Sequence, residues 1–336
     1  MKEQAIVWFQ DGVKLRSPEK KWGEIDMLTE RLISLIGHPE FNHLIIKPEN
    51  CMRQLRGKLD SPTTNFSAVI DLAGFGQRVE NFLPEPNPPV IGRFRLSRVR
   101  NVLSPRLDGC GHLLSIPQDK SQRLISQVDI SQPLLVDDVG WSGRTVLEAA
   151  KILGIDTQRV TVAFLVGNAG SFGENKPGAV GLLENVGIKV ISGELVETPK
   201  DDGFHLSDFF DHPFIPEGEI FDVVIRIQQL REEMMICDEQ RKRVIEQEIS
   251  NLLLSNREVL FPNAKSTQEL KELQSEGVFV NAGGIPKNSM FDVNPPNWLM
   301  PSFSRRVRSD MLRQNKAQII DTLQGLRDVV DIWRFL

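Results

Sequence analysis

Residues 133–149, PLLVDDVGWSGRTVLEA, hold the side chains best suited to bind a ligand. An apolar run leads into two aspartates, then into a short loop with Ser142, Gly143 and Thr145, and then into a helical pattern. A glycine lets the backbone approach a ligand closely, and the unpaired N–H groups of a helix N-terminus suit a phosphate. The two hydroxyls can donate hydrogen bonds to the same phosphate. The loop therefore predicts a phosphate site at the start of a helix.

The two aspartates, Asp137 and Asp138, point to a second part of the same ligand. Two carboxylates do not hold a phosphate, because like charges repel. They suit ribose hydroxyls as hydrogen-bond acceptors, or a magnesium ion held through water. In an open α/β sheet they would lie at the carboxyl end of a strand, where ligands bind. The combined pattern predicts a ribose 5-phosphate as the ligand.

Two other protein classes also place acidic residues at the end of an apolar strand. A P-loop ATPase needs an upstream G-x-x-x-x-G-K-[ST] motif, and the sequence has none. A response-regulator receiver needs a phospho-accepting aspartate at the end of a later strand, but residues 159–166 run into Gly167 and Asn168. Both interpretations are therefore less favoured than the ribose-phosphate site.

Residues 136–145, VDDVGWSGRT, resemble the phosphoribosyl-pyrophosphate (PRPP) binding loop of type I phosphoribosyltransferases. This motif is most similar to that of the uracil-related members, which regulate bacterial pyrimidine operons. The resemblance implies that Asp137 and Asp138 hold the ribose hydroxyls. It assigns the 5-phosphate to Val139, Gly140, Trp141, Ser142, Gly143, Arg144 and Thr145. Trp141 is bulkier than the small residue or threonine usual in the family.

The resemblance extends over residues 66–196 and implies two further parts of a site. The family's pyrophosphate loop would correspond to Ala73, Gly74, Phe75, Gly76 and Arg78. The family's flexible hairpin would correspond to Ser97 to Gly109, so we expect residues 97–112 to form a mobile lid. Residues 92–106 hold basic but no acidic residues, and Arg98, Arg100 or Arg106 could neutralise a pyrophosphate leaving group. The alternative is that these arginines are solvent-facing side chains of a strand.

The resemblance implies an enzyme that takes PRPP with Mg²⁺ and transfers ribose 5-phosphate to a nitrogen acceptor, such as a nucleobase, with release of pyrophosphate. No catalytic general base can be named from the sequence. The rival interpretation is a non-catalytic module that senses PRPP or a nucleotide and acts through its C-terminal helices. The lack of a cation before Arg78 in the pyrophosphate loop favours the sensor, and the ribose-phosphate loop fits both.

The elements that must position this loop alternate between strands and helices over residues 66–196. This alternation predicts an α/β fold with a mostly parallel twisted sheet flanked by helices, as in phosphoribosyltransferases. Apolar runs and helical periodicities give individual expectations. Strands are expected at 5–9, 67–72, 133–136, 159–166 and 188–191, one strand of a hairpin at 90–103, and helices at 23–37, 48–59, 77–82 and 145–153.

The C-terminal third has a different character. Residues 217–256 lack proline, and lack glycine after Gly218, and their apolar residues follow a heptad-like pattern. We expect one continuous helix of roughly 60 Å, buried on the core or against a second copy of the chain. A last helix is expected at 304–333. The expected regions are therefore 1–65 packing on the core, 66–215 as the phosphoribosyltransferase-like core, and 216–336 as a helical extension.

Composition limits the class of protein. With 336 residues, 40% of them hydrophobic, the chain can bury a sizeable core. A net charge of −5 argues against a surface made to grip nucleic acid, although a local basic patch would still be compatible with it. No run of about 18 apolar residues occurs, so we expect a soluble cytoplasmic protein without a membrane partner.

One histidine cluster has two interpretations. His205 and His212 lie with Asp208 and Asp211 in GFHLSDFFDHPF. A metal site would need a cysteine or a third histidine nearby, so a loop packed on the core is favoured.

Overall fold

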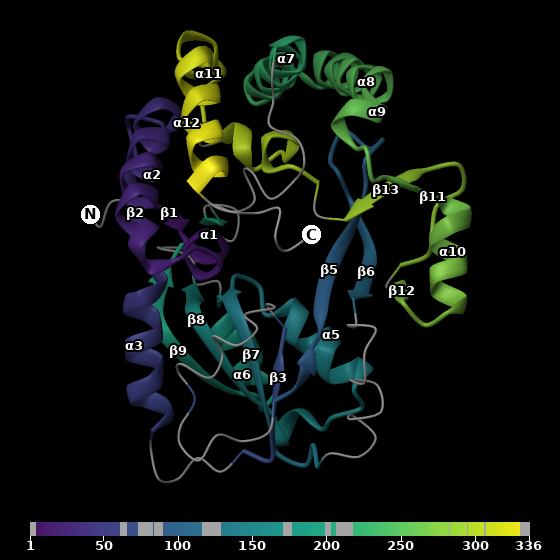
Figure 1. Ribbon diagram of the computed structural model, residues 1–336. Coiled ribbons are helices and arrows are strands. Elements are labelled where there is room, and N and C mark those ends of the chain that lie inside the picture. Colours follow the sequence, from purple (N-terminus) through teal and green to yellow (C-terminus); the bar gives the residue numbers. More distant parts are fainter. Residues whose placement is uncertain are drawn as a thin grey trace.

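The computed structural model describes residues 5–60, 66–72, 83, 90–115, 129–170, 177–198, 203–205, 218–281, 283–293, 295–305 and 307–329. These residues form three sheets surrounded by helices (Figure 1). No helix among them is long and apolar enough to cross a membrane. The helices are α1 (Asp11–Arg16), α2 (Trp22–Ile36), α3 (Pro48–Leu59), α5 (Arg144–Ile152), α6 (Ala179–Asn185), α7 (Gly218–Met234), α8 (Glu239–Ser255), α9 (Arg257–Leu260), α10 (Thr267–Ser275), α11 (Ser309–Gln314) and α12 (Lys316–Val329).

The central sheet is parallel and has the strand order β4-β3-β7-β8-β9. Its strands are β3 (Ala68–Asp71), β4 (Val90–Arg93), β7 (Pro133–Gly140), β8 (Thr161–Gly170) and β9 (Lys189–Glu197). Alternate side chains enter two different cores, because successive residues of a strand point to opposite faces. Leu134 and Val136 pack with α3, whereas Leu135 packs with α5 and α6. The expected α/β class, with a parallel sheet flanked by helices, is confirmed.

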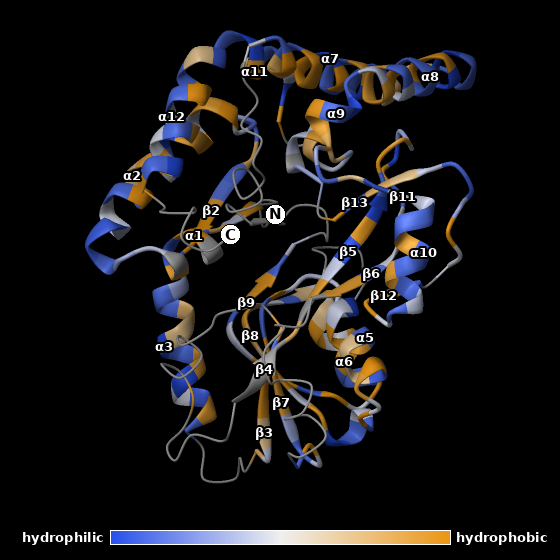
Figure 2. Cartoon of the chain, turned by 45° about the vertical axis from the view of Figure 1, so that its right-hand side comes forward, coloured by the Kyte–Doolittle hydropathy of each residue, from blue (hydrophilic) through white to orange (hydrophobic). Residues whose placement is uncertain are grey.

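Two further sheets complete the described fold, one of three strands and one of five. A parallel sheet has the order β10-β1-β2, and an antiparallel sheet has the order β11-β13-β5-β6-β12. Their strands are β1 (Ala5–Phe9), β2 (Asn42–Ile46), β5 (Arg95–Asn101), β6 (Gly109–Ser115), β10 (Gly203–His205), β11 (Lys265–Ser266), β12 (Phe279–Asn281) and β13 (Met290–Val293). Figure 2 shows hydrophobic residues along the central strands and mixed hydropathy on the outer helices α3, α10 and α12.

The single strand expected at 90–103 is wrong, because the chain changes sheet at Phe94. Its first part is β4, which pairs with β3, and its second part is β5, which pairs with β6. The partner strand β3 ends at Asp71, so the chain loses its hydrogen-bonding neighbour there. The amide of Phe94 makes a last bond to the carbonyl of Asp71 (2.7 Å), and its ring is buried beside α5.

The continuous helix expected over 217–256 is also wrong: α7 and α8 are separated by a turn at residues 235–238. The Asp238 side chain ends the turn by accepting a hydrogen bond from the Arg241 amide (2.8 Å), which caps α8. Both helices bury their apolar stripes in the same core. A straight helix of that length would leave part of the stripe exposed, so the folded-back pair buries more apolar surface. An ion pair of 2.6 Å between Arg226 and Glu248 also joins the two helices.

The last helix is divided as well. Residues 303–305 form a 3₁₀ turn, and α11 ends at Gln314, with Asn315 as its C-cap, before α12 begins. The Asn315 side chain donates to the Leu35 carbonyl at the end of α2 (2.9 Å). Residues 330–336 lie outside the described residues.

The N-terminal segment packs on both later regions. Leu28 and Leu32 of α2 share a buried cluster with Leu323 and Leu326 of α12. In contrast, α3 packs on β8 and β9 of the central sheet. Residues 5–60 therefore join the two halves of the structure.

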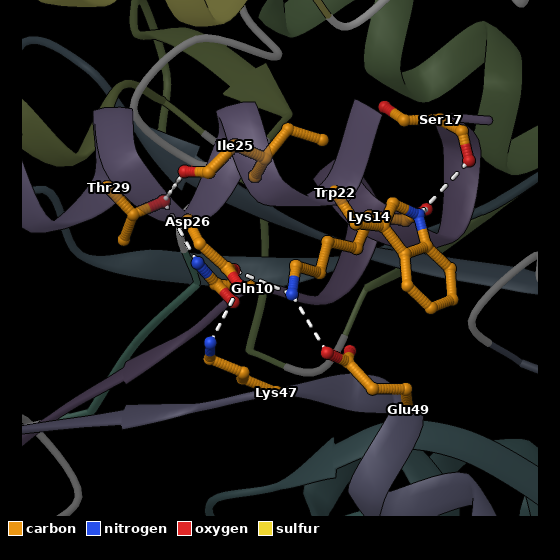
Figure 3. Close-up of polar contacts among 9 residues, drawn as sticks. All are labelled: Gln10, Lys14, Ser17, Trp22, Ile25, Asp26, Thr29, Lys47 and Glu49. Carbon is orange, nitrogen blue, oxygen red and sulfur yellow. Dashed lines mark hydrogen bonds and ion pairs between the residues drawn. The ribbon is translucent and has the colours of Figure 1, made fainter. Parts of the chain in front are cut away.

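A buried ionic network holds this N-terminal segment together (Figure 3). The Lys14 ammonium is fully buried and lies 2.6 Å from Asp26 and 2.9 Å from Glu49. Lys47 is 2.6 Å from the second oxygen of Asp26. Burial by itself would raise the pKa of Asp26, but hydrogen bonds from the two lysines outweigh it, so this pKa lies below its ordinary value. The network connects α1, α2 and the start of α3.

Candidate functional site

The expected phosphate loop lies at the switch point of the central sheet. In chain order the five strands are arranged 2-1-3-4-5, so β3 is followed by a strand on one side and β7 by a strand on the other. In open α/β sheets ligands bind outside the carboxyl ends of the strands at such a point. The Leu72 amide donates to the Val136 carbonyl (2.8 Å), which aligns the ends of β3 and β7. Topology thus places the aspartates where a ligand is expected.

The aspartates belong to β7, which runs to Gly140 and is longer than the expected 133–136. Asp137 is buried and Asp138 is half-buried. One carboxylate oxygen of Asp137 accepts from the Asp138 amide (3.1 Å), and one of Asp138 accepts from the Val139 amide (2.7 Å). These local bonds orient the carboxylates, and an ionised carboxylate has further acceptor positions for ligand hydroxyls.

The loop reaches α5 through a left-handed glycine. Gly143 has φ +66°, and a Cβ built there would lie 2.8 Å from Leu183. A Cβ at Gly140 would lie 2.6 Å from the Phe164 ring. Larger residues are thus disfavoured at both positions by packing, and at Gly143 also by backbone conformation. The helix begins at Arg144, one residue before the expected start, and ends at Ile152; Gly154, two residues later, has φ +64°.

The start of α5 has donors to offer an anion. No side chain caps this helix, so its first amides are not satisfied by a capping oxygen. Ser142 and Thr145 are half-buried, and within the part of the chain that the structure describes their hydroxyls make no hydrogen bond. Arg144 is exposed. Val139 is buried and Trp141 packs against the same core as α3, so these two support the loop.

Asn168 is a part of the site that the sequence analysis did not assign. It lies at the end of β8 and is 2% exposed. Its amide nitrogen donates to the carbonyls of Thr198 (3.0 Å) and Trp141 (3.4 Å), and its oxygen accepts from the Gly170 amide (3.0 Å). The side chain therefore ties the phosphate loop to the end of β9. An asparagine at a strand end beside the loop was the available signal.

Changing Asn168→Asp should loosen this loop. The new carboxylate keeps the bond from Gly170 but faces the Trp141 and Thr198 carbonyls with an acceptor where a donor is needed. We expect a loss of about 2 kcal/mol of unfolding free energy, measured by urea denaturation, and weaker phosphate binding. Asn281→Asp is the matched control, because the Asn281 oxygen accepts from the Gly283 amide in the same way (3.0 Å). Equal losses in both variants would contradict this role.

The two remaining parts expected from the sequence are placed less completely. Ala73, Gly74, Phe75, Gly76 and Arg78, the expected pyrophosphate loop, lie outside the described residues, directly after β3.

Residues 97–112 form most of a β-hairpin inside the antiparallel sheet, rather than a loop between two strands. The guanidinium of Arg98 lies across Gly109, where a Cβ would be 2.7 Å from its Nε. Arg100 donates to the Leu107 carbonyl (3.2 Å), and Arg106 pairs with Glu246 of α8 (3.1 Å). Closure over the site stays a prediction.

Of the three expected lid arginines, Arg98 is the one with a described link to α5. Its strand neighbour His112 is buried, and burial lowers the pKa of this histidine. Arg144 and Arg98 lower that pKa further, whereas Glu148 opposes the shift. Arg98 and Arg144 therefore act on the same imidazole, at the junction of the hairpin with the first turns of α5. Arg106 is instead held at α8.

Asp137 and Asp138 fit a magnesium ion that is bound together with the phosphates of a substrate. Among the described residues no group of three or more histidine, cysteine, aspartate or glutamate side chains could hold a metal ion. Mg²⁺ is commonly bound by one or two carboxylates, several waters and the phosphates of a substrate. Asp137 and Asp138 fit that arrangement, in which the metal arrives with the ligand. For the histidine cluster, His205 is in β10, but 208–212 lie outside the described residues.

Comparisons with known proteins do not assign a family. No family model matches the chain, and no curated protein matches it. Among solved structures it is similar to a hypothetical protein from Neisseria gonorrhoeae with bound ppGpp. The identity is 18%, the match covers 49% of this chain and 86% of that chain, and the TM-score is 0.29. A TM-score this low carries no inference about fold or ligand.

Proposed function

We propose that the chain is a phosphoribosyltransferase-like protein that binds PRPP with Mg²⁺ at the switch point between β3 and β7. One observation carries the proposal: the left-handed Gly143 opens an uncapped helix next to two aspartates at that switch point. A phosphate at the helix start and a hydroxylated sugar at the aspartates together describe a ribose 5-phosphate.

As an enzyme, the protein would transfer the ribose 5-phosphate to a nitrogen acceptor and release pyrophosphate. The first amides of α5 and the hydroxyls of Ser142 and Thr145 would hold the 5-phosphate. Asp137 and Asp138 would accept hydrogen bonds from the ribose hydroxyls, which fixes the sugar. Bound Mg²⁺ would supply positive charge to the pyrophosphate. Because positive charge develops on the sugar as the bond to pyrophosphate breaks, catalysis would come mainly from positioning and charge neutralisation.

A sensor is the second candidate, and the state of the hairpin favours it. Arg100 and Arg106, two of the cations expected to meet the pyrophosphate, are bonded within the hairpin and to α8. A protein that only binds PRPP does not need them at the leaving group. In this alternative the ligand signals through the C-terminal helices, without group transfer.

Two measurements test the proposal. Calorimetry with PRPP and Mg²⁺ should show binding, and loss of binding in Asp137→Asn would locate it. Pyrophosphate release is then followed with a panel of nucleobases and small nitrogen acceptors, with Asp137→Asn as the blank. Release above the blank identifies an enzyme, and binding without release favours the sensor. The absence of PRPP binding to the folded wild-type protein would overturn both forms.

A further inference from the structure

The β5–β6 hairpin has its base against the helix that opens the proposed phosphate site. Leu96 of β5 and Leu114 of β6 are buried in one cluster with Val146 and Ala149 of α5. Val146 is in the first turn of that helix, whose first amides would face the proposed phosphate. A displacement of the hairpin base would therefore change the packing around the first turns of α5.

The tip of the same hairpin lies in a different core. Val102 and Leu107 are fully buried together with residues of α7 and α8, among them Ile227 and Ile249. Figure 1 shows the two strands running from the side of α5 toward the region below α8 and α9. The hairpin thus connects the central α/β sheet to the C-terminal helical pair.

Between these ends the two strands of the hairpin are paired along most of their length, with a register shift between Val99 and Arg100. Its strands pair from Arg95 with Ser115 to Arg100 with Gly109. β13 pairs with the outer side of β5, and β12 with the outer side of β6. The seven residues of β5 span about 23 Å. A shift at one end is therefore transmitted to the other.

The docked tip contains two unfavourable features. Leu107 is a non-glycine residue with φ +48°, a left-handed conformation that a branched side chain rarely adopts. Arg231 of α7 is 6% exposed; its Nη2 donates to the Pro105 carbonyl (3.2 Å), but its Nη1 is buried without a hydrogen-bond partner among the described residues. Burial lowers the pKa of Arg231 to about 9. Apolar burial of Val102 and Leu107 opposes these costs.

We infer that the β5–β6 hairpin couples the phosphate loop to the α7–α8 pair, so that docking of the hairpin tip regulates the proposed PRPP site. The identity of the ligand rests on the proposed function, whereas the coupling between loop and tip does not. A docked tip holds the start of α5 in place, and an undocked tip loosens it. By thermodynamic reciprocity, a ligand at the loop stabilises the docked tip to the same extent.

Hydrogen exchange in the ligand-free full-length chain tests the coupling directly. Leu107→Ala should weaken docking and increase exchange at residues 141–147 by about fivefold or more. Leu323→Ala is the matched control, because Leu323 is equally buried in the same core but lies on α12 against α2. Faster exchange at 141–147 in Leu107→Ala alone supports the inference. The same exchange in both variants overturns it.

A second variant keeps the test decisive if Leu107→Ala does not fold. Arg231→Met removes both the buried guanidinium with its unsatisfied Nη1 and the hydrogen bond from Nη2 to the Pro105 carbonyl, so docking of the tip on α7 should change and exchange at 141–147 should change with it. Arg226→Met is its control on the same helix, since Arg226 is exposed and pairs with Glu248 rather than with the hairpin. A change of exchange at 141–147 in Arg231→Met alone, in either direction, supports coupling, and no difference between the two variants overturns it.

PRPP with Mg²⁺ added to the wild-type protein separates the two proposals. Protection of residues 141–147 supports the proposed function, and added protection of 102–107 supports the coupling. Protection of 141–147 alone overturns the regulatory inference and leaves the ligand assignment standing. No protection at either segment counts against PRPP as the ligand, and the variants then decide the coupling by themselves.

Discussion

Replacing Asp137 and Asp138 together by asparagine is expected to weaken PRPP binding by at least about 100-fold while leaving the fold intact. A hydrogen bond to a charged group contributes about 1.5–3 kcal/mol, so weakening two of them reaches roughly 3 kcal/mol, which is about 100-fold in Kd. Each asparagine keeps a carbonyl oxygen for the local bonds from the Asp138 and Val139 amides. Calorimetry with PRPP and Mg²⁺ measures the affinity, and thermal unfolding checks the fold.

A control for this change exists in the other five-stranded sheet. The Asp292 carboxylate accepts from the Val293 amide at 2.7 Å, the same local bond as that between Asp138 and the Val139 amide. Asp292→Asn is therefore the same chemical change as Asp138→Asn, but Asp292 lies on β13 of the antiparallel sheet rather than in the central sheet. PRPP affinity should fall in Asp138→Asn and stay unchanged in Asp292→Asn. Unchanged affinity in a folded double variant at 137 and 138 would refute the site.

Replacing Lys14 by methionine is expected to destabilise the protein by about 3 kcal/mol. The lysine is fully buried, and its removal leaves the carboxylates of Asp26 and Glu49 close together without the cation between them. Breaking a buried ion pair by removing one partner commonly has an effect of this size. The usual loss is about 3–5 kcal/mol. We expect the lower value, because the side chains of Asp26 and Glu49 are 22% and 26% exposed. Urea denaturation of both proteins measures the difference.

Lys21→Met provides the comparison, since Lys21 pairs with Glu24 at the surface, where an ion pair contributes about 0–1 kcal/mol. The pH dependence gives a second readout. The pKa of Asp26 is lowered in the folded protein, so its contribution to stability is present above its unfolded value of 3.8 and is lost as the pH falls through the lower folded value. Lys14→Met should lose less stability than the wild type in this acid window. Equal effects of the two lysine variants at neutral pH would show that burial of Lys14 is unimportant.

The sequence by itself determined the class of fold and the position of the candidate loop. Residues 68–70 and 134–136 are buried on both faces of the sheet, so they appear as continuous apolar runs. The helix expected at 48–59 has the same bounds in the structure. Pro48 suits the first position of a helix, and the apolar residues of this segment repeat with a helical period. The loop at 137–145 could be identified from the sequence because its residue types match a local backbone conformation, with a left-handed glycine before a helix, and the donors that the proposed phosphate would require.

Only the tertiary structure decided where these segments change partner. The break between β4 and β5 depends on where the neighbouring strand β3 ends, and the sequence of residues 90–103 holds no information about that position. The turn between α7 and α8 has a capping residue, Asp238, but the uninterrupted apolar stripe concealed it. The docking of Leu107 beside α7 and the link from Asn168 to Trp141 join residues far apart in the chain. Local periodicity reports which face of a segment is buried, whereas the burying partner is selected by packing of the whole chain.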